Sequence, residues 1–197
     1  QLVVDLNPMI DLSLVEKMRT LLSKKGNLKS NRSISQLSDL NYFGIEYKAP
    51  CDAAKTDIVS GTIDACISTN TLEHIPQESI VRIFSELRRT LKPDGIIAAN
   101  IDYSDHYAHT DSSISLLNYL HYSDSEWKKF NHSCHYQNRL RHYDYLEIFR
   151  CCGFIILEED ITYGETEIPK TLKKLFSDKE ASWAATSAYL VLKKIVK

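Results

Sequence analysis

Four stretches of the sequence end in polar side chains that could hold a ligand, at points where a strand is expected to stop. "QLVVD" ends at Asp5, "YKAP" is closely followed by Asp52, "IDACISTN" ends at Asn70, and "IIAANID" ends at Asp102. In open α/β sheets, ligands bind in the crevice at the carboxyl ends of the strands. A carboxylate there can accept hydrogen bonds from both hydroxyls of a ribose, so the set predicts a nucleoside-bearing ligand. Each Asp taken singly is more often a turn or N-cap residue.

Histidines follow the last of these strand ends, in "IDYSDHYAHTD". Histidine titrates near neutral pH, so we predict His106 as the general base of a reaction and Asp102 as the second candidate. The alternative interpretation is a polar surface loop. Asp102, His106 and His109, with the later "HSCH", also suggest a metal site. Neither an HExxH motif nor paired-Cys spacing is present, and we therefore predict that no metal binds.

A third polar group lies in "LEHIP", directly after the strand that ends at Asn70. One interpretation makes this corner the wall of a ligand crevice, with His74 beside the substrate. The other makes it a polar turn into a helix, where Glu73 complements the positive end of the helix dipole. The sequence alone favours neither role for these two residues.

The hydrophobic pattern predicts the elements that position these side chains. Strands are expected over 1–6, 43–50, 62–70 and 96–102, and helices over 7–25 and 76–91, with Pro76 as a first helical residue and "KPDG" as a turn. A further helix over 142–152, with Gly153 as its C-cap, precedes two strands over 154–164 and 187–195. The alternation of strand and helix up to residue 102 predicts a parallel sheet with helices on its faces.

Residues 103–138 show no clean period and are rich in His, Tyr, Ser and Asp. Connections of this length are usually functional or disordered, and the many aromatic residues argue against disorder. We predict a substrate lid that lines a pocket for a small polar molecule, for example a sugar. Arg139 could hold a phosphate or carboxylate of that substrate, or it could simply pair with an acid on the surface.

Two stretches resemble a known family. "IDACISTNTLEHIPQESIVRIFSELRRTLKPDGIIAANID" resembles the middle of class I S-adenosylmethionine-dependent methyltransferases, and "NRLRHYDYLEIFRCCGF" resembles their segment before the last two strands. The resemblance implies a single domain over residues 1–197 with an α/β fold. This fold is a three-layer Rossmann-like sandwich whose sheet is mostly parallel and whose last strand is antiparallel. It also implies methyl transfer from S-adenosylmethionine to a small molecule or a glycan precursor.

The resemblance assigns roles to individual residues of this chain. Asp5 matches the acid that binds the cofactor ribose, Asp52 matches the acid beside the adenine, and Ala53 supplies a backbone contact. Asn70 and Thr71 match the strand end that faces the methionine part of the cofactor. The residue types of the corner at His74 and of the predicted lid and its end suggest four residues that contact the substrate: His74, Tyr103, His109 and Arg139.

The sequence departs from the family at the glycine-rich loop, which precedes the acid matched by Asp5. None of the six glycines forms a GxG motif, and Gln1 already reads as the inside of a strand, so we expect an N-terminally incomplete domain. Such a chain is expected to bind the cofactor weakly or not at all. A non-catalytic module with the same fold is the main alternative. A nicotinamide-dependent oxidoreductase is a further alternative, but the final pair of strands resembles the methyltransferase ending instead.

The bulk composition fits an ordinary globular protein, with 43% hydrophobic and 25% charged residues in 197. The formal net charge of -2 gives no reason to expect a nucleic-acid partner, and no apolar stretch is long enough to cross a membrane. Three of the five cysteines (Cys66, Cys151 and Cys152) lie among apolar residues, which predicts buried, reduced thiols in a cytoplasmic protein. The sequence leaves the oligomeric state open.

Overall fold

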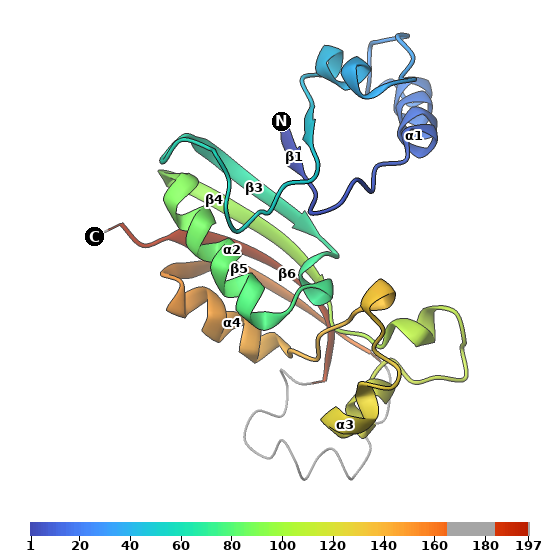
Figure 1. Cartoon of the computed structure of the whole chain (residues 1–197), viewed down its shortest axis with the longest axis vertical. Coiled ribbons are helices and arrows are strands. Elements are labelled where there is room, and N and C mark those ends of the chain that lie inside the picture. The colour runs from blue at the N-terminus through green and yellow to red at the C-terminus, as the bar shows by residue number, and fades with distance from the viewer. Residues whose placement is uncertain (165–183, 197) are drawn as a thin grey trace. The chain divides into compact units, whose positions relative to one another are not determined.

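The computed structural model describes residues 1–164 and 184–196, shown in Figure 1. The chain forms two compact units, Gln1–Thr56 and Asp57–Lys197. The segment expected to separate the last two strands falls mainly on residues 165–183 and lies outside the described residues. Each unit is described below by itself.

The first unit combines a parallel pair of short strands with one long helix. β1 (Leu2–Val4) pairs with β2 (Glu46–Lys48), α1 spans Leu12–Lys24, and the 3-10 helix η1 spans Leu37–Phe43. The Asp11 side chain caps α1 by accepting a hydrogen bond from the Ser13 N–H at 2.8 Å. Gly26, with φ of 74°, follows the helix as predicted.

The apolar stripe predicted for α1 is exposed in this structure. Leu14 and Met18 are 59% and 56% exposed, and no residue of α1 is buried. Within the first unit only Ile34, Asp39 and Leu40 are buried. The unit therefore has a very small hydrophobic core.

The second unit contains a four-stranded sheet of order β3-β4-β6-β5. β3 (Ile63–Thr69) runs parallel to β4 (Leu91–Asp102), whereas β6 (Ala185–Lys194) runs antiparallel to both β4 and β5 (Phe154–Tyr163). This arrangement confirms the predicted α/β class with an antiparallel last strand. Among the described residues, β3 pairs with β4 alone, and β1 pairs with β2 alone.

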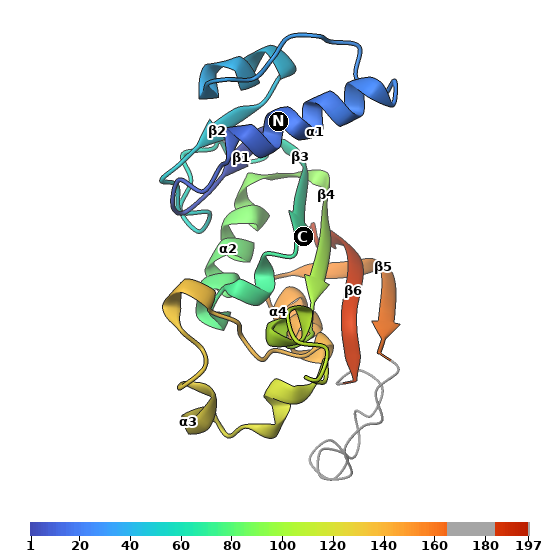
Figure 2. The same ribbon diagram turned by 90° about the vertical axis from the view of Figure 1, so that its right-hand side faces the viewer.

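Two helices pack on one face of this sheet. Figure 2 shows α2 (Gln77–Thr90) and α4 (His142–Cys151) on the same side of the strands. Phe84 of α2 lies 4.5 Å from Phe149 of α4 and 5.7 Å from Phe154 of β5, measured between ring centroids. All three rings are fully buried, so this aromatic cluster joins both helices to the sheet. The opposite face leaves Ile67 73% exposed.

Three local expectations need correction. Pro76 is the N-cap of α2 and not its first residue, and its fixed φ of -58° suits either position. The "KPDG" stretch lies within β4, which begins at Leu91, although the pairing shifts in register beside it. Cys151 is exposed, whereas Cys66 and Cys152 are half-buried, and all five cysteines are free thiols.

Residues 103–138 form short helices joined by turns. These are η3 (His106–His109), η4 (Asn118–His121), α3 (Asp124–Trp127) and η5 (Ser133–His135). The buried Arg141 holds the segment to the sheet, because its guanidinium donates to the carbonyls of Tyr103, at 2.7 Å, and Ala185. The segment is therefore folded, as its aromatic content predicts.

The turn after α4 brings two helices together at a glycine. Gly153 has φ of 81°, in the region that favours glycine, and its carbonyl accepts a hydrogen bond from Arg88 Nη1 at 2.6 Å. Arg88 lies in the last turn of α2. A Cβ atom at position 153 would overlap the Arg88 guanidinium.

Candidate functional site

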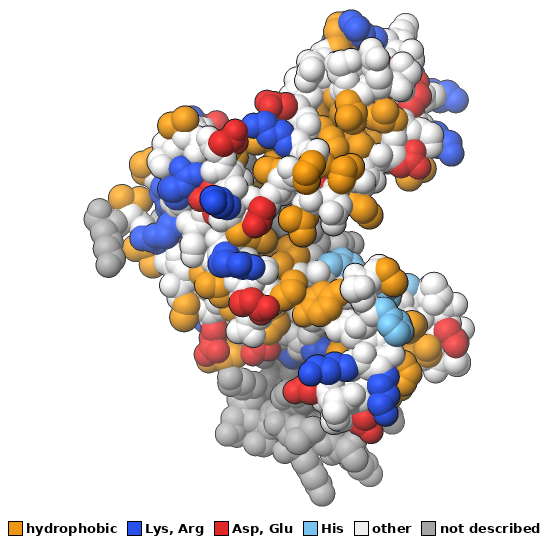
Figure 3. All heavy atoms as spheres, viewed as in Figure 1, with side chains coloured by type: hydrophobic (Ala, Val, Ile, Leu, Met, Phe, Trp, Pro, Cys, Tyr) orange, Lys and Arg blue, Asp and Glu red, His pale blue; other side chains and the backbone are white. Residues whose placement is uncertain are grey.

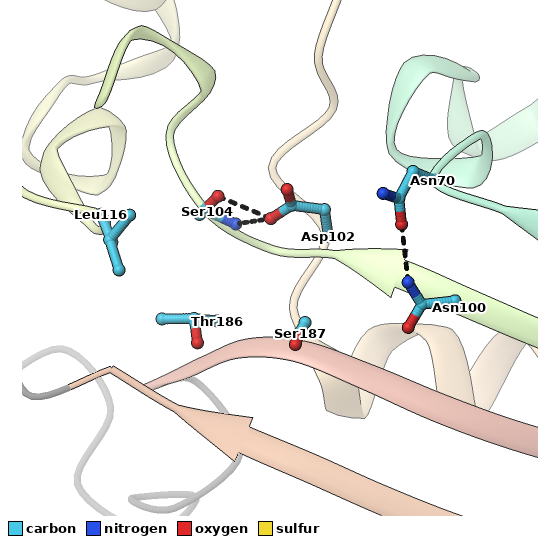
Figure 4. Close-up of a pocket in the computed structure, with 7 residues that line it drawn as sticks. All are labelled: Asn70, Asn100, Asp102, Ser104, Leu116, Thr186 and Ser187. Atoms are coloured by element: carbon cyan, nitrogen blue, oxygen red, sulfur yellow. Dashed lines mark hydrogen bonds between the residues drawn. The ribbon is translucent and has the colours of Figure 1, made fainter. Parts of the chain in front are cut away.

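A polar hollow lies at the carboxyl ends of β3 and β4 in the second unit. Its volume is about 320 Å³. Figure 4 shows the residues that line it: Asn70, Asn100, Asp102, Ser104, Leu116, Thr186 and Ser187. Because β6 is antiparallel, its first residues reach the same edge as the ends of β3 and β4. Six of the seven lining side chains carry polar atoms, so the hollow suits a ligand with several hydroxyl or amine groups.

Asn70 adopts an unusual backbone conformation at the end of β3. Its φ is 48°, and it is the one described non-glycine residue with positive φ. The Asn70 Oδ1 atom accepts a hydrogen bond from Asn100 Nδ2 at 2.7 Å, and the Asn70 N–H donates to the Asn100 carbonyl at 2.9 Å. Asparagine tolerates this region better than most residues, and such conformations cluster at ligand sites. The pair fixes the rim of the hollow.

Asp102 presents one oxygen to Ser104 and the other to histidines. Its Oδ1 atom accepts hydrogen bonds from the Ser104 N–H at 2.8 Å and the Ser104 hydroxyl at 2.6 Å. Its Oδ2 atom lies 3.7 Å from His106 Nε2 and 3.5 Å from His109 Nε2. The Ser104 pair fixes the carboxylate, and Oδ2 remains available as a proton acceptor.

The tautomer of His109 follows from these contacts. Its Nε2 atom lies 2.9 Å from Ser104 Oγ, whose single proton is donated to Asp102. His109 Nε2 therefore carries a proton and donates it to the serine oxygen. Because His109 is exposed, it can exchange protons with solvent.

His106 is held more deeply beside Asp102. Its Nε2 atom is buried and has no hydrogen-bond partner among the described residues. Burial lowers the pKa of His106, and three neighbouring histidines lower it further. The negative charge of Asp102 acts in the opposite direction and raises this pKa. The ring is therefore neutral at pH 7 and has a nitrogen that could accept a proton.

Glu73 lies next to this group and is 2% exposed. Neither of its carboxylate oxygens has a hydrogen-bond partner among the described residues. Burial raises the pKa of Glu73 to about 7, with an additional contribution from the charge of Asp102, while His74 acts in the opposite direction. The nearby N–H groups of Glu73 and Asp102 also oppose the shift, although neither meets hydrogen-bond geometry.

His74 is exposed on the 3-10 helix η2 (Leu72–His74). Its Nδ1 atom lies 2.8 Å from the Tyr136 carbonyl oxygen, which can only accept, so Nδ1 carries a proton and the lone pair of the neutral ring is on Nε2. Its ring centroid lies 4.8 Å from that of His106. The "LEHIP" corner thus places Glu73 and His74 beside the histidines that follow β4. Figure 3 shows histidine side chains gathered on one face of this region.

The residues assigned to the cofactor ribose and adenine lie in the first unit. Asp5 Oδ2 accepts a hydrogen bond from the Tyr47 hydroxyl at 2.7 Å. Asp52 is exposed, and its Oδ1 atom accepts from the Ala54 N–H at 2.9 Å, as a turn residue does; Ala53 is half-buried. In the second unit, the exposed Thr71 donates its hydroxyl to the Thr69 carbonyl.

Two residues expected at the substrate are engaged in structural contacts. Tyr103 is 1% exposed, and its hydroxyl lies 3.0 Å from the Nδ1 atom of the buried His142. Arg139 donates to the carbonyls of Tyr119 and Tyr122 and pairs with Asp124. Tyr103 thus has almost no surface for a ligand in this structure. Arg139 nevertheless lines a second cavity of about 790 Å³ within the segment 103–138 and its surroundings.

Sequence reasoning missed several residues of the hollow. Asn100, Thr186 and Ser187 line it but were not assigned a role, and Glu73 was not placed in the site. A polar Asn inside the apolar run "IIAANID" was an available signal for Asn100. Thr186 and Ser187 reach the site only through the antiparallel direction of β6, which is not visible in residue types.

Comparison with known proteins relates this chain to methyltransferases. Residues 10–99 match the family described as a methyltransferase domain. A solved S-adenosylmethionine-dependent methyltransferase from Methanosarcina mazei is 12% identical, with a TM-score of 0.54 over 100% of this chain and 82% of that chain. Residues 10–99 are thus similar to a methyltransferase domain, and the chain has the fold of S-adenosylmethionine-dependent methyltransferases. S-adenosylmethionine is the cofactor of that family.

Two further solved structures share the methyltransferase fold. A protein from Pyrococcus horikoshii is 15% identical, with a TM-score of 0.51 over 98% of this chain and 71% of that chain. The cyclase SpnF is 16% identical, with a TM-score of 0.50 over 82% of this chain and 62% of that chain. No curated protein matches the sequence significantly. At these identities the likeness concerns the fold, and the cyclase shows that one fold hosts different reactions.

Among the described residues of this chain, no helix is long and apolar enough to cross a membrane.

Proposed function

We propose that this chain transfers a methyl group from S-adenosylmethionine to a hydroxyl or amine of a small polar molecule, such as a sugar or a glycan precursor. The observation that supports this most directly is the polar hollow at the ends of β3 and β4, where Asp102 faces two histidines. The methyltransferase domain match supplies the reaction class. The hollow supplies a place where an acceptor with several polar groups could be held and deprotonated.

The donor set fits the cofactor by its chemistry. Carboxylates at Asp5 and Asp52 suit ribose hydroxyls and an adenine edge, and the amide of Asn70 with the hydroxyl of Thr71 suits the charged methionine part. When bound, S-adenosylmethionine supplies an activated methyl group on a sulfonium. The protein then has to align the acceptor and remove its proton.

We assign proton removal to Asp102 and His106. The acceptor's O–H or N–H proton would pass to Asp102 Oδ2 or to the neutral ring of His106, which lie 3.7 Å apart. Removal of this proton would leave an electron pair on the acceptor atom, ready to receive the methyl group that the cofactor would supply. Ser104 keeps Asp102 oriented throughout, because two of its hydrogen bonds end on Oδ1. We also assign substrate contact to His74 and His109, and their exposure beside this pair supports that assignment.

A calorimetric titration of S-adenosylhomocysteine into the full-length gene product tests the cofactor assignment. We expect binding of one molecule per chain, abolished by Asp5→Ala and retained by Asp102→Asn. A well-folded protein that shows no binding would overturn the methyltransferase proposal. It would support the alternative, a non-catalytic module that shares the fold.

A second experiment separates binding from chemistry. Transfer of labelled methyl groups to a panel of sugars and other polar metabolites identifies an acceptor. With that acceptor, Asp102→Asn should lower kcat by about 10²–10⁴-fold, the usual contribution of a general base. An unchanged kcat would remove Asp102 from the proposed mechanism.

A further inference from the structure

Three side chains of metal-ligating type meet where η2 approaches η3. One ligand atom from each of Glu73, His74 and His106 lies within 4.8 Å of the other two. Both carboxylate oxygens of Glu73 and the Nε2 atom of His106 are buried and without hydrogen-bond partners among the described residues. Buried polar atoms are nearly always satisfied, so three such atoms at one place point to a missing partner.

The third side chain is already oriented as a ligand. Nδ1–H of His74 donates to the Tyr136 carbonyl at 2.8 Å, which leaves the lone pair on Nε2. Metal-ligating histidines almost always donate their second ring N–H to a carbonyl or carboxylate in this way. The hydrogen bond to Tyr136 therefore presets both the tautomer and the direction of the ring.

We propose that Glu73, His74 and His106 bind one divalent transition-metal cation of the zinc or iron(II) kind. Two imidazoles and one carboxylate match the ligand sets of zinc hydrolases and of non-haem iron sites. Magnesium and calcium prefer sites made entirely of oxygen ligands. The cation would neutralise the Glu73 carboxylate and accept the lone pairs of both histidines, so one ion satisfies all three groups.

Ion binding requires a modest movement. Ligands about 2.0–2.2 Å from a shared ion lie about 3.0–3.5 Å apart, so the widest separation has to shorten by about 1–2 Å. His74 is the side chain best able to move, because it is exposed, whereas Glu73 is buried. The exposed side of His74 also gives the ion a path from solvent.

A three-ligand site leaves coordination positions open, which is typical of catalytic metal centres. An oxygen of the methyl acceptor would take one of these positions, and Asp102, 3.7 Å from His106 Nε2, would stay outside as the proton acceptor. This role rests on the proposed methyl transfer, whereas cation binding does not. Sequence reasoning favours no metal here because Glu73 and His74 are remote from His106 in the chain.

The test is a calorimetric titration of zinc chloride, and separately of manganese(II) chloride, into chelator-treated full-length protein without a histidine tag. We expect one ion per chain, with affinity reduced at least tenfold by Glu73→Gln and by His74→Ala. His132→Ala, which removes an exposed histidine outside the cluster, is the matched control and should bind as the unaltered protein does.

Binding of neither ion by the folded protein overturns the proposal, as does binding that neither Glu73→Gln nor His74→Ala weakens. A parallel titration of magnesium chloride that shows tighter binding than zinc would also overturn it. Titration of S-adenosylhomocysteine into the same samples keeps the two proposals apart. Binding of zinc without S-adenosylhomocysteine would support the metal site and overturn the methyltransferase function. Binding of S-adenosylhomocysteine without zinc would support the methyltransferase function and overturn the metal site.

Discussion

The two carboxylate oxygens of Asp102, at the end of β4, have different roles. One oxygen is fixed by the backbone and hydroxyl of Ser104, and the other faces His106 and His109. The carboxylate is thus oriented by its own sequence neighbour and still available to a ligand. An Asp in a plain turn would present both oxygens to solvent or to the backbone.

The thiol of Cys66 gives a residue-scale test of the buried side of β3. Burial raises the pKa of Cys66 to about 11. At pH 8 about one thiol in a thousand is then ionised, and the thiolate is the reactive form. We expect iodoacetamide to modify the exposed Cys134 and Cys151 within minutes while Cys66 remains largely unmodified.

Mass spectrometry of the alkylated peptides measures this difference directly. The same reaction in denaturant should modify all three cysteines at similar rates. Rapid native modification of Cys66 would show that this face of β3 is more open than the structure indicates.

At this scale the sequence predicted the acids at strand ends but not their neighbours. Asp102 and His106 were predicted because they lie at and just after the end of an apolar run that the sequence marks as a strand. Glu73 could not be placed, because its burial depends on the packing of η2 against residues after β4. Tyr103 was predicted as a pocket residue from its type, and only its contact with His142 reveals that it lies in the core.

Among the elements, the corner at residues 72–76 depends on one amide. Asn138 Nδ2 donates to the carbonyls of Leu72, at 2.9 Å, and Ile75, at 2.8 Å, and its side chain also contacts the Tyr145 hydroxyl. Asn138→Asp keeps the shape but removes the donor, so the Ile75 carbonyl loses this hydrogen bond and the Leu72 carbonyl keeps only the one from the Ile75 N–H. We expect a loss of about 1–3 kcal/mol in the free energy of unfolding.

Urea denaturation followed by circular dichroism measures this loss. Asn41→Asp, at an exposed position, makes the same atomic exchange and should leave the stability of the protein nearly unchanged. Equal effects of the two substitutions would mean that Asn138 does not hold the corner.

A second element-scale contact predicts a pH dependence in the first unit. Glu16 of α1 pairs with Arg19 at 2.8 Å and accepts a hydrogen bond from the Ile34 N–H at 2.8 Å, which together lower the pKa of Glu16 to about 2. Because the folded-state pKa lies below the unfolded value of 4.5, Glu16 stabilises the unit above pH 4.5. That contribution is lost as the pH falls from 4.5 towards 2.

Hydrogen exchange of the Ile34 amide, followed between pH 6 and pH 3 and corrected for intrinsic rates, tests this contact. We expect its protection to fall towards pH 3 in the unaltered chain and to be low at every pH in Glu16→Gln. A protection that is the same in both chains would exclude the contact as a source of stability.

The elements themselves were largely predictable. Periodicity identified α1, α2 and α4 and all six strands, because the apolar spacing of each is visible in the residue types. The spacing did not predict burial, since the apolar residues of α1 are exposed. The start of β4 was missed, because "KPDG" has the composition of a turn. Leu91 pairs with Ile63 and the pairing resumes at Ile96, so "KPDG" lies in an irregularity of β4 that has no partner residues in the β3 register.

The whole molecule divides its hydrophobic core very unevenly between the two units. The first unit buries three residues, whereas the second contains a continuous cluster from α2, α4 and the four strands. A unit of fewer than 60 residues with so little buried surface is marginal by itself. We expect amides of β1 and α1 to exchange with deuterium at least tenfold faster than those of β4 and α4.

Mass spectrometry of hydrogen exchange under native conditions measures this contrast. Equal protection in both units would show that the first unit is stabilised by more than its own contacts. Addition of S-adenosylhomocysteine should raise the protection around Asp5 if the proposed cofactor assignment holds, because a ligand that binds the folded state stabilises it.

The turn at Gly153 also determines which sequences this fold can accept. Position 153 has a left-handed backbone, and a Cβ atom there would force the Arg88 guanidinium to move away from the Gly153 carbonyl that it contacts. Gly61, with φ of 69°, has open space around it, so only its backbone is constrained. A saturation library selected for folding should therefore favour glycine more strongly at 153 than at 61, where asparagine should also be accepted. Two glycines with the same backbone conformation thus differ in their tolerance of substitution, because only Gly153 has a side chain in the space beside it.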